Sequence, residues 1–341
     1  EHILDAPDTY IGQVDMDETK NWLLQDDGSF KYQTYSWIPG LFKCFDEGIV
    51  NARDHAVRMS EKYKKSKNII PVKNISIEVD EKTGVITMIN DGNGIDVAKH
   101  PEYDLWIPEM IFGHLRTSTN YDKSEKKIVG GKNGFGFKLV LIYSKWGTIE
   151  TVDHVRKKKY TQRFENNLEK IQPPVIKRST VKPYTKVSWL PDYKRFGIEK
   201  LTYTMFKLFK KRTYDIAAVT DKQVVVKFNG NTLPIRTFEQ YINMYIGTKD
   251  QTKRLFETSP NGRWEYAVCL SPVDEFTHIS FVNGISTTRG GKHVDYVLKQ
   301  ITRKMQTYIE KKKKIKVKEN TIKEQLMLFL NCVVENPSFD S

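Results

Sequence analysis

The sequence predicts an α+β fold with a mixed, mainly antiparallel sheet. Over residues 40–65 apolar side chains recur with helical spacing and a Lys-rich segment follows, which predicts one long helix. Residues 74–80 and 84–90 alternate apolar and polar side chains on either side of a Lys-Thr-Gly turn, which predicts a β-hairpin. Three more alternating segments predict strands in the same half of the chain, at residues 147–152, 185–190 and 224–228.

The strand pattern starts again after about residue 240. Residues 264–270 and 278–282 predict strands, a helix is expected from about His293 into a lysine run, and residues 326–334 predict a closing strand. A chain of 341 residues with 39% apolar residues is long enough for two ordinary hydrophobic cores. We therefore expect two domains, over residues 1–240 and 241–341.

Composition restricts the function classes. The net charge of +13 favours a polyanionic partner such as nucleic acid, although a merely basic surface explains it equally well. The three cysteines form no C-x-x-C pair, so neither a zinc site nor a disulfide framework is predicted, and a reducing intracellular setting is expected. No apolar run reaches the roughly 18 residues of a membrane span. Because the first residue is Glu1, the chain is expected to be a piece of a larger protein.

Glu47 and Asn51 form the first candidate site. Their spacing of four residues places both side chains on one face of the predicted helix, one turn apart. A carboxylate can take a proton from water, and a carboxamide oxygen can bind a hard cation. The alternative for the pair is a polar helix face that is simply exposed to water.

A second candidate follows the predicted strand that ends at Asn90. Asp91 lies in the sequence Asn-Asp-Gly-Asn-Gly, which is most often only a turn. In a functional interpretation, the Asp91 carboxylate accepts a hydrogen bond from an adenine amino group, and glycines such as Gly94 leave room for a flat ring.

Residues 130–138 are rich in glycine and precede a predicted helix over residues 137–143. The segment lacks the Gly-Lys-Ser/Thr of a P-loop and the spacing of a dinucleotide fingerprint. Glycines that turn backbone N–H groups toward one point, with Lys132 and Lys138 nearby, suit a triphosphate. The alternative is a flexible glycine loop, and residues 117–132 before it are predicted to be a long polar loop.

The order of these segments resembles the Bergerat ATP-binding fold of the GHKL family, which includes gyrase-type topoisomerases, Hsp90, histidine kinases and MutL. Further runs look like the ATPase region of eukaryotic type IIA DNA topoisomerases, and the resemblance spans nearly the whole chain. These runs are residues 7–12, 39–43, 117–122, 281–285, 290–296 and 335–340.

The resemblance implies residue roles. Glu47 is the expected general base, Asn51 the Mg²⁺ ligand, and Asp91 with Asn90 the adenine reader. Other residues are expected to touch ribose and phosphates, namely Ser118, Thr119, Asn120, Gly131, Lys132, Asn133, Gly134, Phe135, Gly136, Phe137 and Lys138. The lysines Lys311, Lys312, Lys313 and Lys314 match a basic loop that contacts transported DNA, and the alternative for them is a solvated charged face. The chain departs from the family pattern at His55, at Gly48, where a bulky apolar residue is usual, and at Phe137, where a small one is usual.

The resemblance also implies a Bergerat α/β sandwich followed by a transducer domain of the ribosomal-protein-S5-like βαβ type. ATP and Mg²⁺ are the expected cofactors, and the expected partners are double-stranded DNA, a second copy of the chain on ATP binding, and the cleavage core of a longer topoisomerase chain. A nuclear location is expected for a cellular protein and the host cytoplasm for a viral one. The alternatives are an ATPase like MutL or Hsp90, and a nucleotide-gated DNA clamp without turnover.

Overall fold

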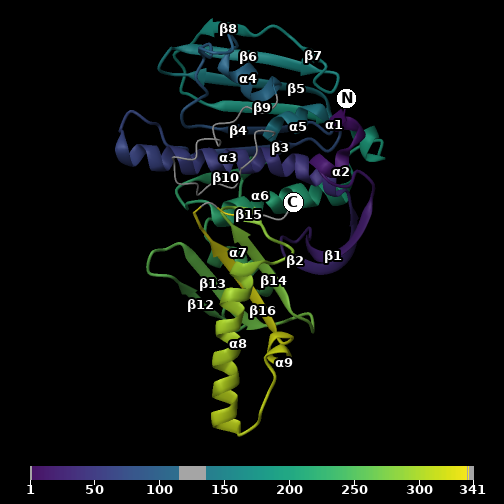
Figure 1. The fold of residues 1–341 in the computed structure, drawn as a ribbon, viewed down its shortest axis with the longest axis vertical. Helices are drawn as coiled ribbons and strands as arrows, with labels where there is room; N and C mark the ends of the chain where they lie inside the picture. Colours follow the sequence, from purple (N-terminus) through teal and green to yellow (C-terminus); the bar gives the residue numbers. More distant parts are fainter. Residues whose placement is uncertain (1, 115–135, 336, 338–341) are drawn as a thin grey trace. The chain divides into compact units, whose positions relative to one another are not determined.

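The computed structural model describes residues 2–114, 136–335 and 337. It divides into two compact units, Glu1–Arg236 and Thr237–Ser341 (Figure 1). Among the described residues, none of the helices combines the length and the apolar character needed to cross a membrane.

The first unit contains a nine-stranded sheet with the strand order β11-β10-β3-β4-β9-β5-β6-β7, in which β8 also pairs with β6. Among the described strands of this sheet, only β10 and β3 pair in parallel, so the predicted mixed, mainly antiparallel sheet is confirmed. The strands are β3 (Asn74–Val79), β4 (Ile86–Asn90), β5 (Ser144–Asp153), β6 (Lys158–Glu165), β7 (Lys170–Ile171), β8 (Val175–Arg178), β9 (Thr185–Pro191), β10 (Val225–Phe228) and β11 (Asn231–Thr232).

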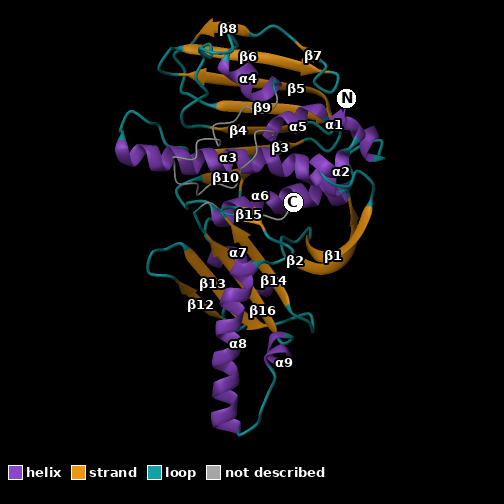
Figure 2. Ribbon diagram, viewed as in Figure 1, coloured by secondary structure: helices purple, strands orange, loops and turns teal. Residues whose placement is uncertain are grey.

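Helices pack on this sheet, and a separate antiparallel hairpin of β1 (Asp17–Leu24) and β2 (Phe30–Trp37) contacts one of them (Figure 2). The helices of the unit are α1 (His2–Asp5), α2 (Pro7–Tyr10), α3 (Pro39–Lys65), α4 (Ile107–Gly113), α5 (Gly136–Ile142) and α6 (Tyr203–Val219), with a 3₁₀ turn at Tyr193–Phe196. By register, Met88, Trp189 and Phe228 lie on one face of the sheet. Met88 and Trp189 lie against α3 at Gly48, Trp189 also contacts α5, and Phe228 contacts α6. The unit is therefore a two-layer α/β sandwich.

Helix α3 forms as predicted, and its sequence explains its bounds. Pro39 stands in the first turn, where its missing N–H is not needed, and three lysines in the last turn complement the helix dipole. Its apolar face is buried, and Phe45 stacks on Phe209 of α6 with ring centroids 4.4 Å apart. The Glu47 segment is thus fixed against the body of the unit.

The second unit is a five-stranded sheet with helices on both faces. Its elements are α7 (Phe238–Ile246), β12 (Leu255–Thr258), β13 (Trp264–Leu270), β14 (Thr277–Val282), β15 (Ile285–Ser286), α8 (Lys292–Lys313), α9 (Glu319–Lys323) and β16 (Leu326–Cys332). Leu328 and Leu330 of β16 pack in the core under α8, whereas the intervening Phe329 contacts Tyr245 of α7. Strands β14 and β16 pair in parallel and are joined through α8, which makes a βαβ unit.

Candidate nucleotide-binding site

Glu47 and Asn51 lie one turn apart on α3. The Glu47 side chain is 23% exposed and its Oε1 atom lies 3.1 Å from Nζ of Lys43, one turn earlier on the same helix. Asn51 is exposed. The pair therefore presents a carboxylate and a carboxamide at the surface of a helix whose opposite face is locked in the core. This geometry leaves both groups able to reach a ligand.

The turn after β4 is held by Asp91. Its Oδ1 atom accepts hydrogen bonds from the backbone N–H groups of Lys73 (2.7 Å) and Asn74 (2.9 Å), and its Oδ2 atom accepts one from Nδ2 of Asn74 (2.8 Å). Asn90 is buried, and its side chain donates to the Asp91 carbonyl at 2.9 Å. Because a carboxylate has about four lone-pair sites, Oδ2 keeps acceptor capacity for a further donor.

Gly94 allows the chain after this turn to approach β5 closely. A Cβ atom at Gly94 would lie 2.0 Å from the carbonyl oxygen of Val152, so a side chain cannot fit there without moving the backbone. The next residue, Ile95, donates its N–H to Oγ1 of Thr151 at 2.9 Å. Strand β5 thus occupies the space beside Gly94, and this contact fixes the position of the Asp91 turn.

His55 joins α3 to the same turn, which the sequence pattern does not reveal. Its Nε2 atom lies 2.7 Å from the carbonyl oxygen of Asn93, so Nε2 carries the proton and donates it. Burial, reinforced by the nearby charge of Arg58, lowers the pKa of His55 to about 4. The imidazole is therefore neutral at physiological pH and acts as a clamp between the helix that bears Glu47 and Asn51 and the turn that bears Asp91.

This clamp predicts a loss of stability in mild acid. Between pH 6.5 and 4 the unfolded chain takes up a proton at His55 and the folded chain does not, so the stabilisation is complete above about pH 6.5 and is lost as pH falls. The loss should approach about 3 kcal/mol. We expect His55→Gln, which keeps an N–H donor without titrating, to lose less stability than the parent protein between pH 7 and pH 4.5 in urea denaturation. Equal losses in both proteins would contradict the assignment.

Helix α5 brings two predicted residues into the core. Phe137 packs edge-to-face on Phe112 of α4 and on Trp189 of β9, so only its backbone is available to a ligand. Lys138 is buried, and burial lowers the pKa of its ammonium group to about 8. Gly136 has a φ of +34°, a left-handed conformation that favours glycine. Lys138 thus supplies a weakly solvated cation on a helix that contacts α3.

The other predicted phosphate-loop residues lie outside the described residues and stay predictions. They are Ser118, Thr119, Asn120, Gly131, Lys132, Asn133, Gly134 and Phe135. In the second unit, Lys311, Lys312 and Lys313 form the last turn of α8 and Lys314 caps it with a φ of 54°; all four are exposed.

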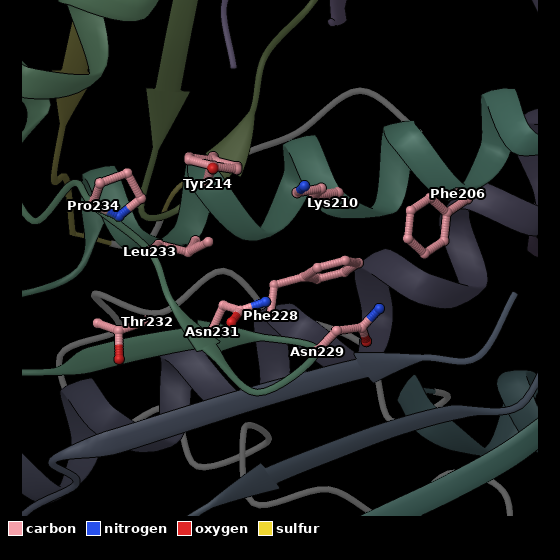
Figure 3. Close-up of a pocket in the computed structure, with 9 residues that line it drawn as sticks. All are labelled: Phe206, Lys210, Tyr214, Phe228, Asn229, Asn231, Thr232, Leu233 and Pro234. Atoms are coloured by element: carbon pink, nitrogen blue, oxygen red, sulfur yellow. The ribbon is translucent and has the colours of Figure 1, made fainter. Parts of the chain in front are cut away.

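A separate pocket of about 210 Å³ lies between α6 and the β10–β11 hairpin. Phe206, Lys210 and Tyr214 line it from the helix (Figure 3). The hairpin and the residues after it supply Phe228, Asn229, Asn231, Thr232, Leu233 and Pro234. None of the predicted nucleotide-site residues that the structure describes lines this pocket.

Comparisons with known proteins decide the family. The profile of histidine kinase-, DNA gyrase B- and HSP90-like ATPases matches residues 38–177, and that of DNA gyrase B matches residues 237–341. The crystal structure of the ATPase region of Saccharomyces cerevisiae topoisomerase II is 39% identical and superposes with a TM-score of 0.90, covering 100% of this chain and 85% of that one. The chain belongs to the type II DNA topoisomerase family.

Two further matches support membership of the topoisomerase family. The ATPase and transducer domains of DNA topoisomerase II from Balamuthia mandrillaris are 35% identical with a TM-score of 0.90, again covering 100% of this chain and 85% of that one. DNA topoisomerase 2 of Acanthamoeba polyphaga mimivirus is 43% identical over 349 residues. That match covers all of this chain but only 27% of the mimivirus protein, so the chain spans about a quarter of that relative's length. The resemblance and the GHKL fold predicted from the sequence are confirmed.

Proposed function

We propose that the chain binds and hydrolyses ATP as the ATPase region of a type II DNA topoisomerase. The observation that carries the proposal is the placement of Glu47 and Asn51 on one face of α3, clamped through His55 to the turn that bears Asp91. A base, a cation ligand and an adenine acceptor thereby belong to one rigid part of the fold. Membership of the topoisomerase family supports the same conclusion.

Glu47 acts as the general base in this proposal. Its carboxylate accepts a proton from a water molecule as the water oxygen bonds to the γ-phosphorus and the bond to the β–γ bridging oxygen breaks, giving ADP and phosphate. Lys43 forms an ion pair with this carboxylate at 3.1 Å. Lys138 offsets phosphate charge, and the remaining acceptor capacity of Asp91 serves the adenine amino group.

The available donors fit Mg²⁺. The ion prefers oxygen ligands and usually keeps several waters while one or two protein groups and the substrate phosphates complete its shell. Asn51 presents an exposed carboxamide on α3, and the described part of the chain contains no cluster of three or more His, Cys, Asp or Glu side chains that would form an all-protein cage. Asn51 is therefore the residue that would hold the ion. When bound, the ion would neutralise negative charge on the β- and γ-phosphates.

We assign residues 1–240 to the ATP-binding domain and residues 241–341 to the transducer domain. The division into compact units and the gyrase B profile over residues 237–341 support this assignment. In the proposed cycle ATP binding joins two copies of the chain into a closed gate around a DNA segment. Hydrolysis is coupled to strand passage, while the cleavage core of the longer chain cuts the DNA. The setting is intracellular, in the nucleus or, for a viral protein, in the host cytoplasm.

Relaxation of supercoiled plasmid by the full-length protein tests the proposal. We expect relaxation to require ATP and Mg²⁺ and to fall at least about 100-fold in Asn51→Ala, because the cation loses its protein ligand. The matched control is Ser60→Ala, an exposed polar position on the same helix. Relaxation without ATP, or wild-type activity in Asn51→Ala, would contradict the proposal. ATP binding without any turnover would favour the DNA-clamp alternative.

The lysine run should contact duplex DNA. Each phosphate contact steepens the dependence of log affinity on log salt by about 0.9. With Lys311 to Lys314 changed to alanine in the full-length protein, we expect that slope to decrease by about 2 to 4. The affinity is measured by fluorescence anisotropy over a salt series. An unchanged slope would leave the run as a solvated charged face.

A further inference from the structure

Gly48, which directly follows Glu47, lies against the sheet with no room for a side chain. A Cβ atom there would lie 2.7 Å from Sδ of Met88 and 3.1 Å from Cη2 of Trp189. Because a glycine inside a helix costs roughly 1 kcal/mol relative to alanine, its presence needs a packing reason. The reason is the close approach of α3 to the Trp189 ring.

Phe137 contacts the same ring from α5. Its centroid lies 5.0 Å from that of Trp189, with the two planes at 87°, and Phe137 directly precedes Lys138. Trp189 is fully buried, and its Nε1 atom has no hydrogen-bond partner in the part of the chain that the structure describes. Packing against Gly48, Met88 and Phe137 therefore sets the position of the Trp189 ring.

The residue sizes at the two contacts are coupled. Gly48 leaves space on the α3 side of the ring, which Met88 and Trp189 occupy, and the phenyl ring of Phe137 fills the α5 side. Trp189 thus contacts both Gly48, the neighbour of Glu47, and Phe137, the neighbour of Lys138.

We propose that Trp189, held between Gly48 and Phe137, is a positioning residue that fixes the distance between Glu47 on α3 and Lys138 on α5. The inference rests on the proposed ATPase function. Glu47 must lie beside a water next to the γ-phosphate, and Lys138 must lie near the same phosphate. Their two side chains therefore need a fixed separation. A misplacement of 1 Å can cost about 100-fold in rate.

The test is a double-mutant cycle on ATP hydrolysis by the full-length protein. We expect Phe137→Ala and Gly48→Val each to lower kcat about 10- to 100-fold, with the Kd for ATP changed less than about threefold. In the double variant, the valine pushes Trp189 toward the space that the phenyl ring has left. Its kcat should therefore exceed the product of the two single effects by at least about tenfold.

Phe112→Ala is the matched control, because the ring centroid of Phe112 lies 5.5 Å from that of Phe137. It removes the same volume, and its effect should simply multiply with that of Gly48→Val. All rates are measured below the melting temperature of the least stable variant. If Gly48→Val does not fold, Gly48→Ala takes its place in the cycle, and Trp189→Phe should show the same loss of kcat with little change in Kd.

The outcomes separate the two proposals. Multiplicative effects in the Gly48 and Phe137 cycle, or a rise in Kd as large as the fall in kcat, would overturn the positioning role. That result leaves the proposed function standing if the parent protein hydrolyses ATP and Glu47→Ala does not. If the parent protein hydrolyses no ATP, the proposed function itself fails.

Discussion

Replacing Glu47 with alanine should lower the kcat for ATP hydrolysis by about 10²- to 10⁴-fold while ATP still binds. The side chain is 23% exposed on α3 and its neighbours in the core remain unchanged, so the fold should tolerate the truncation. The change removes the carboxylate that takes the proton from the attacking water. Hydrolysis is measured by phosphate release from the full-length protein, and binding by calorimetry with ATP.

Glu61 provides the matched control, because it is also a glutamate on α3 that pairs with a lysine on the same helix, Lys64, at 3.0 Å. Glu61→Ala should hydrolyse ATP at the parent rate. If hydrolysis survives in Glu47→Ala, the general-base assignment is wrong. If ATP binding is lost together with hydrolysis, Glu47 has a structural role instead.

Breaking the buried ion pairs of Arg212 should produce the largest loss of stability. Its side chain is 1% exposed on α6 and lies 2.5 Å from Asp46 on α3 and 3.6 Å from Asp215. Arg212→Met leaves two poorly solvated carboxylates that have lost their guanidinium partner, and Asp215 also pairs with Lys211 at 3.3 Å. We expect a loss of about 3 to 5 kcal/mol in the free energy of unfolding, measured by urea denaturation.

Arg195 on the surface is the control for that prediction. It pairs with Asp192 at 3.0 Å, but its side chain is 44% exposed. Exposed pairs contribute roughly 0 to 1 kcal/mol, so Arg195→Met should change stability by less than about 1 kcal/mol. A similarly small change in Arg212→Met would show that the buried pairs do not hold α3 against α6.

Strong periodicity made much of the fold predictable. The helix predicted over residues 40–65 is α3, the predicted hairpin is β3 and β4, and the second half contains the expected βαβ arrangement. The hairpin of β1 and β2 has no comparable signal, because the first five residues of β1 are polar or charged. Helix α6 is similarly obscured by Lys207, Lys210 and Lys211 within its pattern.

Part of the candidate site could likewise be predicted from the sequence, and part could not. The four-residue spacing of Glu47 and Asn51 is local, so the sequence alone places both on one helical face. The contacts that position them are tertiary. His55 meets Asn93, 38 residues away, and Gly48 meets Met88 and Trp189, and no local pattern encodes these partners. The sequence therefore indicates the reacting groups, and the structure adds the residues that hold them in place.

A crystal structure of the protein with Mg²⁺ and a non-hydrolysable ATP analogue tests the central claim most directly. We expect the adenine amino group within hydrogen-bond distance of Asp91, the ion bound to the carboxamide oxygen of Asn51, and the Glu47 carboxylate beside a water in line with the γ-phosphate. A nucleotide bound elsewhere, for example in the pocket between α6 and the β10–β11 hairpin, would contradict the account.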